Sequence, residues 1–215
     1  MEDHQFMTHA LALGRRNQGQ CWPNPAVGCV IVKEGRVVSR GWTAIGGRPH
    51  AETQALKRAG ALAAGATAFV TLEPCAHQGQ TGPCCDALIA AKVARVVIGA
   101  ADPDPRVAGR GVAALKAAGI EVIEGVEVEA AALDHAGFFN RILRGRPHIA
   151  LKMAASFDGK SAMENGESQW ITGPLARRWV HGMRARYDAV LVGGGTVRRD
   201  NPNLTVRDIG IERQP

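Results

Sequence analysis

One pattern constrains this chain more than any other: His50, Cys75 and Cys84 are metal-ligand side chains that only a specific fold can bring together. A catalytic zinc ion takes three protein ligands and leaves its fourth tetrahedral position to water, whose pKa the metal lowers to about 7. Glu52 follows His50 by two residues, so its carboxylate can approach that water without binding the metal. There it can accept a proton and pass it to a leaving group. We therefore expect these four side chains to share one site.

The same pattern is typical of zinc-dependent deaminases, in which His-x-Glu is followed by Pro-Cys and a second cysteine. Pro74 precedes Cys75 here, but eight residues separate Cys75 from Cys84. The alternative is a structural zinc site, which normally closes with four ligands. Cys85 is the remaining candidate, yet adjacent residues rarely bind one ion, and Glu52 would then have no role. We favour the catalytic site and expect Cys85 to be a small buried helix residue.

Local secondary structure supports this site. Residues 67–72 are a predicted buried strand, which delivers Cys75 to its carboxyl end. Pro49 and Pro83 each suit the first turn of the helix that follows. Two helix N-termini would then face the metal, where their partial positive charge favours a thiolate.

The alternation of strands and helices predicts a mixed, partly parallel α/β sheet with helices on both faces. A polar break divides the chain into domains 1–144 and 147–215. In the first we predict helices over 3–18, 50–59, 84–92, 109–118 and 127–140, and strands over 27–33, 36–42, 67–72, 95–100 and 120–123. In the second we predict strands over 148–156 and 188–192 and a helix over 173–186. The glycines at 193–195 are weak evidence for a nucleotide, with a plain loop as the alternative.

The net charge of +6 comes entirely from the last third of the chain. Residues 1–140 hold 13 Lys+Arg and 13 Asp+Glu, whereas residues 141–215 hold 13 and 7. A deaminase that grips polynucleotide would be basic near its zinc pocket, so we expect no nucleic-acid partner. The later arginines suit a phosphorylated ligand or dinucleotide, with a solvated surface as the alternative.

Nothing in the sequence indicates a membrane or secreted protein. No apolar run approaches the ~20 residues of a membrane helix, and the acidic, polar N-terminus differs from a signal peptide. Three of the five cysteines lie in or beside the zinc motif, and Cys29 reads as a buried free thiol. We expect a cytoplasmic protein without a membrane partner.

Several short motifs resemble the bifunctional riboflavin-biosynthesis deaminase-reductases of bacteria. They are Asn24-Pro25-Ala26-Val27-Gly28, His50-Ala51-Glu52, Glu73-Pro74-Cys75, Pro83-Cys84, Asp102-Pro103, Gly109-Arg110-Gly111 and the stretch GESQWIT at 166–172. The resemblance covers all 215 residues, and the long interval between the two cysteines separates this family from the cytidine and tRNA adenosine deaminases. It implies a cytidine-deaminase-like domain followed by the first part of a dihydrofolate-reductase-like α/β domain.

The resemblance also implies specific activities and residues. The first domain would deaminate 2,5-diamino-6-(5-phosphoribosylamino)pyrimidin-4-one to the corresponding 5-aminouracil, and the second would use NADPH to reduce ribosyl to ribityl. The implied deaminase site comprises the Zn2+ ligands His50, Cys75 and Cys84, catalytic Glu52, and substrate-binding Asn24 and His77. The implied reductase site comprises the NADPH contacts Ala154, Trp170, Thr196 and Asp200, and the substrate contacts Ser168, Arg184, Leu204 and Arg207. Core packing is the alternative role for Trp170 and Leu204, and solvent exposure for His77.

Three features depart from the family pattern. Thr43 stands where the family usually has histidine, and Gln80 stands where it usually has lysine or arginine. We therefore expect the deaminase pocket to bind the substrate phosphate more weakly, while the chemistry at the zinc ion is unchanged. The family's reductase domain continues beyond Pro215, so a chain complete at this residue would be a truncated member in which deamination survives and reduction is lost or severely impaired.

We expect an enzyme that acts on a small molecule and forms a homo-oligomer. Two other functions remain open. One is a nucleoside or tRNA deaminase. The other is a noncatalytic scaffold, a truncated paralogue with structural zinc that pairs with a full-length partner.

Overall fold

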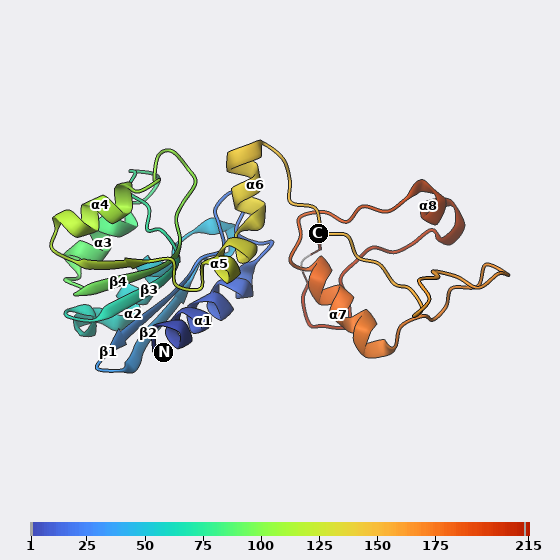
Figure 1. Cartoon of the computed structure of the whole chain (residues 1–215), viewed down its shortest axis with the longest axis horizontal. Coiled ribbons are helices and arrows are strands. Elements are labelled where there is room, and N and C mark those ends of the chain that lie inside the picture. Colours follow the sequence, from blue (N-terminus) through green and yellow to red (C-terminus); the bar gives the residue numbers. More distant parts are fainter. Residues whose placement is uncertain (1, 213) are drawn as a thin grey trace. The chain divides into compact units, whose positions relative to one another are not determined.

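The chain separates into two compact units, Met1–His148 and Ile149–Pro215. The structure is a computed structural model that describes residues 2–212 and 214–215 (Figure 1). The boundary between the units lies just after the polar break at residues 144–147. Within the described residues, no helix is both long enough and apolar enough to cross a membrane.

A five-stranded mixed sheet organises the first unit, in the order β2-β1-β3-β4-β5. β1 pairs antiparallel with β2 and with β3, whereas β3, β4 and β5 run parallel. The strands are β1 Gly28–Lys33, β2 Arg36–Trp42, β3 Thr67–Leu72, β4 Arg95–Ala100 and β5 Glu121–Glu124. β2, β3 and β4 have the predicted bounds, and β1 and β5 begin one residue later than predicted. The partly parallel sheet is therefore confirmed.

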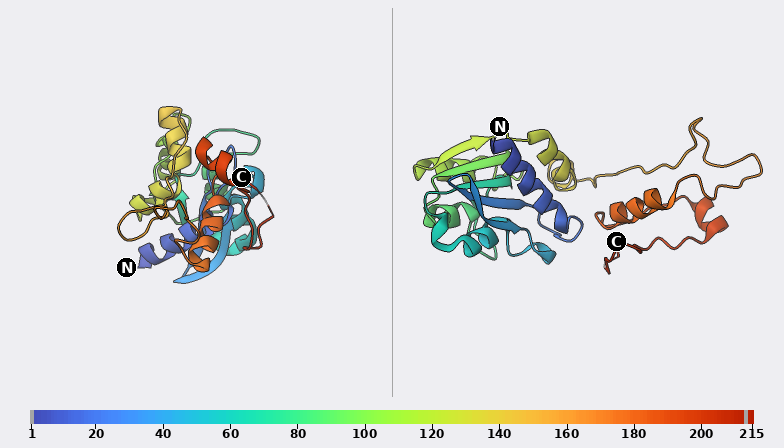
Figure 2. Two further views of the ribbon diagram at one scale, coloured as in Figure 1. Left: turned by 90° about the vertical axis from the view of Figure 1, so that its right-hand side faces the viewer. Right: turned by 90° about the horizontal axis from the view of Figure 1, so that it is seen from below.

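Helices cover both faces of this sheet, as two directions of view show (Figures 1 and 2). α1 and α5 pack on one face, and α2 packs on the other beside α3, which contacts α4. These helices are α1 Glu2–Gly14, α2 Ala51–Ala59, α3 Cys84–Ala90, α4 Arg110–Ala117 and α5 Val128–Asp134. Short 3-10 turns follow at Arg15–Asn17, Ile45–Gly47 and Gly60–Ala63. The chain therefore returns through a helix between successive parallel strands, as such connections require.

The helix predicted over 127–140 is instead two helices, α5 and α6 (Ala136–Arg144), divided at His135. His135 leaves helical geometry with φ −98° and ψ 8°. Its ring is 2% exposed, and its Nε2 lies 3.2 Å from the Thr71 hydroxyl of β3. The prediction of a single helix was wrong because helical periodicity does not reveal a buried polar contact with a distant strand.

The hydrophobic core lies between the sheet and its helices. Phe69 of β3 is 2% exposed and packs on Phe6 of α1, with ring centroids 5.2 Å apart. α1 approaches β1 so closely that a Cβ on Gly28 would lie 1.8 Å from the Ala10 carbonyl oxygen. Cys29 and Cys85 are buried in this core as free thiols, as predicted.

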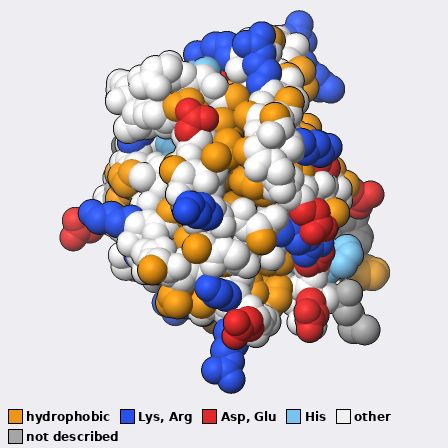
Figure 3. Space-filling view, turned by 90° about the vertical axis from the view of Figure 1, so that its left-hand side faces the viewer, with side chains coloured by type: hydrophobic (Ala, Val, Ile, Leu, Met, Phe, Trp, Pro, Cys, Tyr) orange, Lys and Arg blue, Asp and Glu red, His pale blue; other side chains and the backbone are white. Residues whose placement is uncertain are grey.

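Charges of both signs are distributed over the surface. On the face drawn in Figure 3, Lys and Arg side chains are interspersed with Asp and Glu side chains. Ion pairs join separate elements, because Arg95 of β4 contacts Asp3 of α1 at 2.7 Å and Arg15 contacts Asp134 at 2.7 Å.

The second unit contains α7 (Pro174–Arg184) and α8 (Gly194–Asp200), and its described residues include no strand. α7 begins one residue later and ends two residues earlier than predicted, and the strands predicted over 148–156 and 188–192 were wrong. A strand exists only through hydrogen bonds to a neighbour, and neither segment has such a ladder here. An apolar pattern indicates which side of a strand would be buried, but it does not provide the neighbouring strand.

Candidate metal centre and active-site pocket

Three elements bring the predicted metal ligands together at the carboxyl end of β3. Cys75 lies in the loop after β3, Cys84 is the first residue of α3, and His50 immediately precedes α2. Their ligand atoms all lie within 4.8 Å of one another. His50 Nδ1 is 3.3 Å from Cys84 Sγ and 3.8 Å from Cys75 Sγ.

This donor set fits a zinc ion. Zinc–nitrogen and zinc–sulfur bonds of about 2.0 and 2.3 Å place the ligands of a tetrahedral site roughly 3.5 Å apart. The two separations from His50 are close to that value. Cys85 does not join the cluster, because its thiol is buried and bonded to Asp86 Oδ1 at 3.5 Å. One nitrogen and two sulfurs leave a coordination position open, as a catalytic site requires.

α3 begins directly after Pro83, as predicted, whereas α2 begins one residue later than predicted. Pro83 is the N-cap of α3, and Pro49 precedes His50, which is the N-cap of α2. Cys84 therefore occupies the first helical position, where its backbone N–H has no partner within the helix. That N–H donates to Cys75 Sγ at 3.3 Å, so the start of α3 stabilises negative charge on the neighbouring ligand.

The cluster favours a thiolate on Cys75. The pKa of this thiol falls to about 4, first because the Cys84 side chain hydrogen-bonds to it, and further because of His50 and the Cys84 backbone. The pKa of Cys84 is raised, since its thiol bonds to Cys75 and is buried. The hydrogen bond to Cys75 also raises the pKa of His50. A bound dication would favour the thiolate form of both cysteines.

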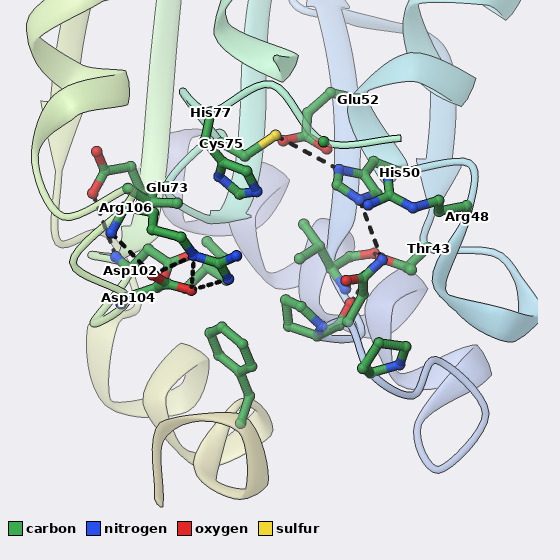
Figure 4. A pocket seen from close by; sticks show the side chains of 18 of the residues that line it. Thr43, Arg48, His50, Glu52, Glu73, Cys75, His77, Asp102, Asp104 and Arg106 are labelled. Atoms are coloured by element: carbon green, nitrogen blue, oxygen red, sulfur yellow. Dashed lines mark hydrogen bonds and ion pairs between the residues drawn. The ribbon is translucent and has the colours of Figure 1, made fainter. Parts of the chain in front are cut away.

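Glu52 lies beside the metal ligands in the first turn of α2. Its side chain points toward Cys75 and His50 (Figure 4) and is 4% exposed. Burial raises the pKa of this carboxyl group to about 7, although His50 opposes the shift. A carboxyl group with such a pKa can both accept and donate a proton at neutral pH.

A cavity of about 390 Å³ opens next to these residues, within the size range of small-molecule sites. Asn24 and His77 line it, as the resemblance implies. Asn24 donates to the Gly47 carbonyl at 2.9 Å, and its amide nitrogen lies 3.5 Å from His50 Nε2. His77 Nδ1 is buried with no hydrogen-bond partner in the described structure, which leaves it available to a bound molecule.

Thr43 and Gln80 also line the cavity. Thr43 is 2% exposed, and its hydroxyl donates to the Pro25 carbonyl at 3.0 Å and accepts the Val27 N–H at 2.9 Å. Because these bonds occupy the hydroxyl, Thr43 holds the loop that presents Asn24. Gln80 is exposed in the loop between the two cysteines.

Six charged residues of the cavity wall were not identified as site residues from the sequence: Arg48, Glu73, Asp102, Asp104, Arg106 and Arg141. The position of Arg48 just before Pro49-His50 was a usable signal, as was the Asp102-Pro103 motif. No sequence signal indicated Arg141, because it belongs to α6, which is far from the metal-ligand motifs along the chain.

These charged residues are held in place by hydrogen bonds. Arg48 donates to the Thr81 hydroxyl at 3.0 Å, and Arg106 pairs with Asp104 at 2.5 Å. The Arg106 guanidinium lowers the pKa of Asp104 to about 2, whereas burial raises the pKa of Asp102 to about 6. The wall thus presents both cations and acids to a bound molecule.

The residues expected to contact NADPH are not gathered into an enclosed site. Thr196 and Asp200 lie exposed on α8, and Ala154 is half-buried. Trp170 is 68% exposed beneath the Arg177 guanidinium, 4.2 Å from its ring centroid, so the core-packing role is wrong for it. No hydrogen bond or ion pair joins these four residues within residues 2–212, and their present arrangement does not fit a dinucleotide.

Three of the four residues expected to contact the reductase substrate do lie close together. Arg184 Nη1 donates to the Thr205 carbonyl at 3.1 Å, and Arg207 Nη1 donates to the Asn203 carbonyl at 3.3 Å, on either side of half-buried Leu204. Burial and then Arg207 lower the pKa of Arg184, which indicates two neighbouring cations. The fourth residue, Ser168, is exposed in a separate loop.

His181 of α7 belongs to the same cluster, although the sequence did not identify it. It is 8% exposed, and its Nδ1 is buried without a partner in the described part of the unit. Burial lowers its pKa, and Arg207 and Arg184 lower it further.

Two family models match this chain. Residues 1–100 match the cytidine and deoxycytidylate deaminase zinc-binding region, and residues 147–215 match the RibD C-terminal domain. The riboflavin biosynthesis protein RibD of Escherichia coli (strain K12) is 52% identical over 214 residues, which cover 100% of this chain and 58% of that protein. RibD of Aquifex aeolicus is 47% identical over 213 residues, with 99% and 60% covered. The chain thus spans about three fifths of these relatives.

Solved structures agree with these matches. A diaminohydroxyphosphoribosylaminopyrimidine deaminase/5-amino-6-(5-phosphoribosylamino)uracil reductase from Thermotoga maritima superposes with a TM-score of 0.91 at 45% identity, covering 100% of this chain and 61% of that one. Acinetobacter baumannii RibD gives 0.85 at 48% identity, with 97% and 59% covered. The Aspergillus oryzae Rib2 deaminase in complex with DARIPP gives 0.54 at 25% identity, with 66% and 94% covered.

Proposed function

Because this chain belongs to the bacterial riboflavin-biosynthesis deaminase-reductase family, we propose that its first unit deaminates 2,5-diamino-6-(5-phosphoribosylamino)pyrimidin-4-one to the corresponding 5-aminouracil. The observation that supports this most directly is that His50, Cys75 and Cys84 meet beside buried Glu52, at a cavity that His50, Glu52 and Cys75 line. Zinc held by these three residues would supply a Lewis acid at the open coordination position.

Glu52 has the proton-transfer role in this proposal. Water adds to the ring carbon that bears the amino group, and ammonia leaves. Glu52 accepts a proton from the water and gives it to the departing nitrogen. Its burial excludes bulk water and keeps the carboxyl group titratable near neutrality.

Asn24 and His77 orient the pyrimidine in the cavity, since both carry polar groups into it. The buried, unpaired Nδ1 of His77 supports a direct hydrogen bond to the substrate. Cationic groups in the wall of the same cavity come from Arg48, Arg106 and Arg141. They offset the two basic residues of the family that Thr43 and Gln80 replace.

A Glu52→Gln variant tests this proposal. We expect the variant to retain its zinc and to lose roughly a thousandfold in turnover of the diaminopyrimidine phosphate, measured as ammonia release, because an amide cannot transfer the proton. Glu129→Gln, an exposed residue of α5, is the matched control and should have normal turnover. Unchanged turnover in Glu52→Gln would contradict the proton-transfer role of Glu52, and no turnover above background in wild type would favour the noncatalytic scaffold.

Substrate comparison separates this function from a nucleoside or tRNA deaminase. Wild-type protein is assayed with the diaminopyrimidine phosphate, cytidine and adenosine-bearing tRNA. We expect ammonia from the first alone, because residues 1–140, which include the metal ligands, hold equal numbers of basic and acidic residues and the cavity is of small-molecule size. Faster release from either of the others would contradict the proposal.

For the second unit we propose a narrower role, binding of a phosphorylated sugar by Arg184 and Arg207. Two close guanidinium groups that form no ion pair within the described chain suit a phosphate. NADPH use is a property of the family's reductase domain, and no hydride-transfer step is proposed here because the NADPH residues are not assembled. Calorimetric titration with ribose 5-phosphate should show binding that Arg184→Ala abolishes and Arg178→Ala, an exposed residue of α7, leaves intact.

We also propose that the protein acts in the cytoplasm and forms homo-oligomers. Cys29, Cys75, Cys84 and Cys85 form no disulfide, which suits a reducing compartment. Exposed Leu133 and Leu143, at 71% and 66%, are apolar surface that a second copy could cover. Light scattering after size exclusion tests the second point, and a monomeric mass would refute it.

A further inference from the structure

Glu73 is the residue after β3, two positions before Cys75, and it is 3% exposed. Its backbone N–H continues the pairing with β4 by donating to the Ala100 carbonyl at 2.9 Å. Its carboxylate faces backbone groups, and no ion pair with Lys or Arg is present in the described structure. A buried carboxylate with no cationic partner requires several hydrogen bonds to be tolerated.

Four backbone N–H groups provide those bonds. Oε2 accepts from Asp102 at 3.4 Å and from Gly109 at 3.0 Å. Oε1 accepts from Gly111 at 3.0 Å and from Val112 at 3.3 Å. One side chain therefore joins the start of the 102–109 loop, its end, and the first turn of α4.

α4 depends on this contact because it has no cap of its own. Its N-cap is Gly109, which has no side chain to bond the free N–H groups of the first turn. Gly111 lies so close to the strand that a Cβ there would be 2.1 Å from the Pro74 carbonyl oxygen. The helix start is thus docked directly on the backbone that leads to Cys75.

The 102–109 loop also forms one wall of the cavity, through Asp102, Asp104, Arg106 and Val107 (Figure 4). We propose that Glu73 is a positioning residue that fixes this wall relative to the metal ligand Cys75, and so places the substrate rather than taking part in proton transfer. This inference rests on the proposed deaminase function.

A Glu73→Gln variant tests the proposal, because the amide has the same shape but presents N–H groups to two of the four donors. We expect KM for the diaminopyrimidine phosphate to rise at least about tenfold, with kcat changed less than KM and zinc content unchanged. Hydrogen exchange of the amides over 102–112 should become faster in ligand-free protein. Glu121→Gln, an exposed acid of β5, is the control and should change neither quantity.

A second variant disturbs the contact between the Glu73 carboxylate and the start of α4 without changing the carboxylate itself. Gly111→Ala forces α4 away from Pro74, so it should raise KM and loop exchange in the same direction. If neither variant folds, exchange in the wild-type protein decides: slow exchange at Asp102, Gly109, Gly111 and Val112 supports the anchor, and fast exchange at these amides overturns it.

Unchanged KM together with unchanged loop exchange in Glu73→Gln would overturn the inference. Loss of zinc, or a fall in kcat alone, would also overturn it by assigning Glu73 to the metal site or to catalysis. If wild-type protein releases no ammonia from the diaminopyrimidine phosphate, the proposed function fails, while the exchange measurement still decides whether Glu73 anchors the loop.

Discussion

At the scale of single residues, neighbouring Cys84 and Cys85 have different surroundings. Cys84 faces His50 and Cys75, whereas Cys85 is buried in the core and bonds to Asp86. The helical turn that begins at Cys84 separates the two side chains, because consecutive residues of a helix point in different directions. This difference allows one thiol to be a ligand while the other packs.

A matched pair of cysteine variants tests this assignment. Cys84→Ser should weaken zinc binding by at least about a hundredfold, since a ligand contributes no less than the residues that orient it. Cys85→Ser should retain zinc at the wild-type level. Metal content and competition with a chromophoric chelator measure both variants, and zinc loss in Cys85→Ser would indicate a four-ligand structural site.

His135 makes stability depend on pH. Burial lowers its pKa to about 4, below the unfolded value of 6.5. Between these values the unfolded state binds more protons than the folded state, so the free energy of unfolding falls as pH drops from 6.5 to 4 and is unaffected by His135 above 6.5. The total effect of this residue is at most about 3 kcal/mol.

Replacing His135 with glutamine should remove this part of the pH dependence. Urea unfolding of wild type and His135→Gln at pH 7.5 and pH 5 is the measurement, with His4→Gln, an exposed residue of α1, as control. An equal loss of stability in wild type and His135→Gln would contradict the assignment.

The residues that we propose to bind zinc and transfer the proton were easier to predict than the residues that surround them. Ligand chemistry restricts the first group to a few residue types at a recognisable spacing, so His50, Glu52 and Cys75 could be chosen from the sequence. Arg106 and Arg141 belong to a wall assembled from a loop and a distant helix, and their side chains look like any surface arginine in sequence. Predicting them required the fold.

At the scale of elements, strands of the core were predicted best. β3 and β4 are continuous apolar runs whose bounds were predicted without error, because burial on both faces leaves little ambiguity. Errors arose where a distant partner decides the outcome: His135 contacts β3 and divides α5 from α6, and the segments at 148–156 and 188–192 have no neighbouring strand among the residues that the structure describes.

The packing of α1 on β1 predicts the effect of one methyl group. Gly28→Ala should lower the free energy of unfolding by about 1–3 kcal/mol, because the new Cβ would meet the Ala10 carbonyl. Gly137→Ala in α6, where the added Cβ would meet no described atom within 4 Å apart from its chain neighbours and its own helix backbone, should leave stability unchanged or raise it by up to about 1 kcal/mol. Urea unfolding of the zinc-loaded proteins gives both values, and equal effects would contradict the packing argument.

At the scale of the whole molecule, the hydrophobic core belongs to the first unit. All residues of the core cluster lie before residue 148, and Val206 is the buried hydrophobic residue among those described in the second unit. Each unit's stability should follow the apolar surface that it buries.

A fragment of residues 1–148 should therefore fold alone. We expect it to bind zinc with the stoichiometry of the full chain, to unfold cooperatively in urea, and to release ammonia from the diaminopyrimidine phosphate. The fragment 149–215 should show no cooperative transition. Loss of zinc from the first fragment would show that the metal centre needs the second unit.

The interval between Cys75 and Cys84 has a consequence for engineering. Its two ends are fixed by the metal ligands, and Arg48 holds its outer part through Thr81. Residues inserted between His77 and Thr81 would alter the entrance to the cavity while both ends stay attached. Selectivity can thus be redesigned at this segment independently of reactivity, which makes it a practical starting point for libraries directed at other aminated rings.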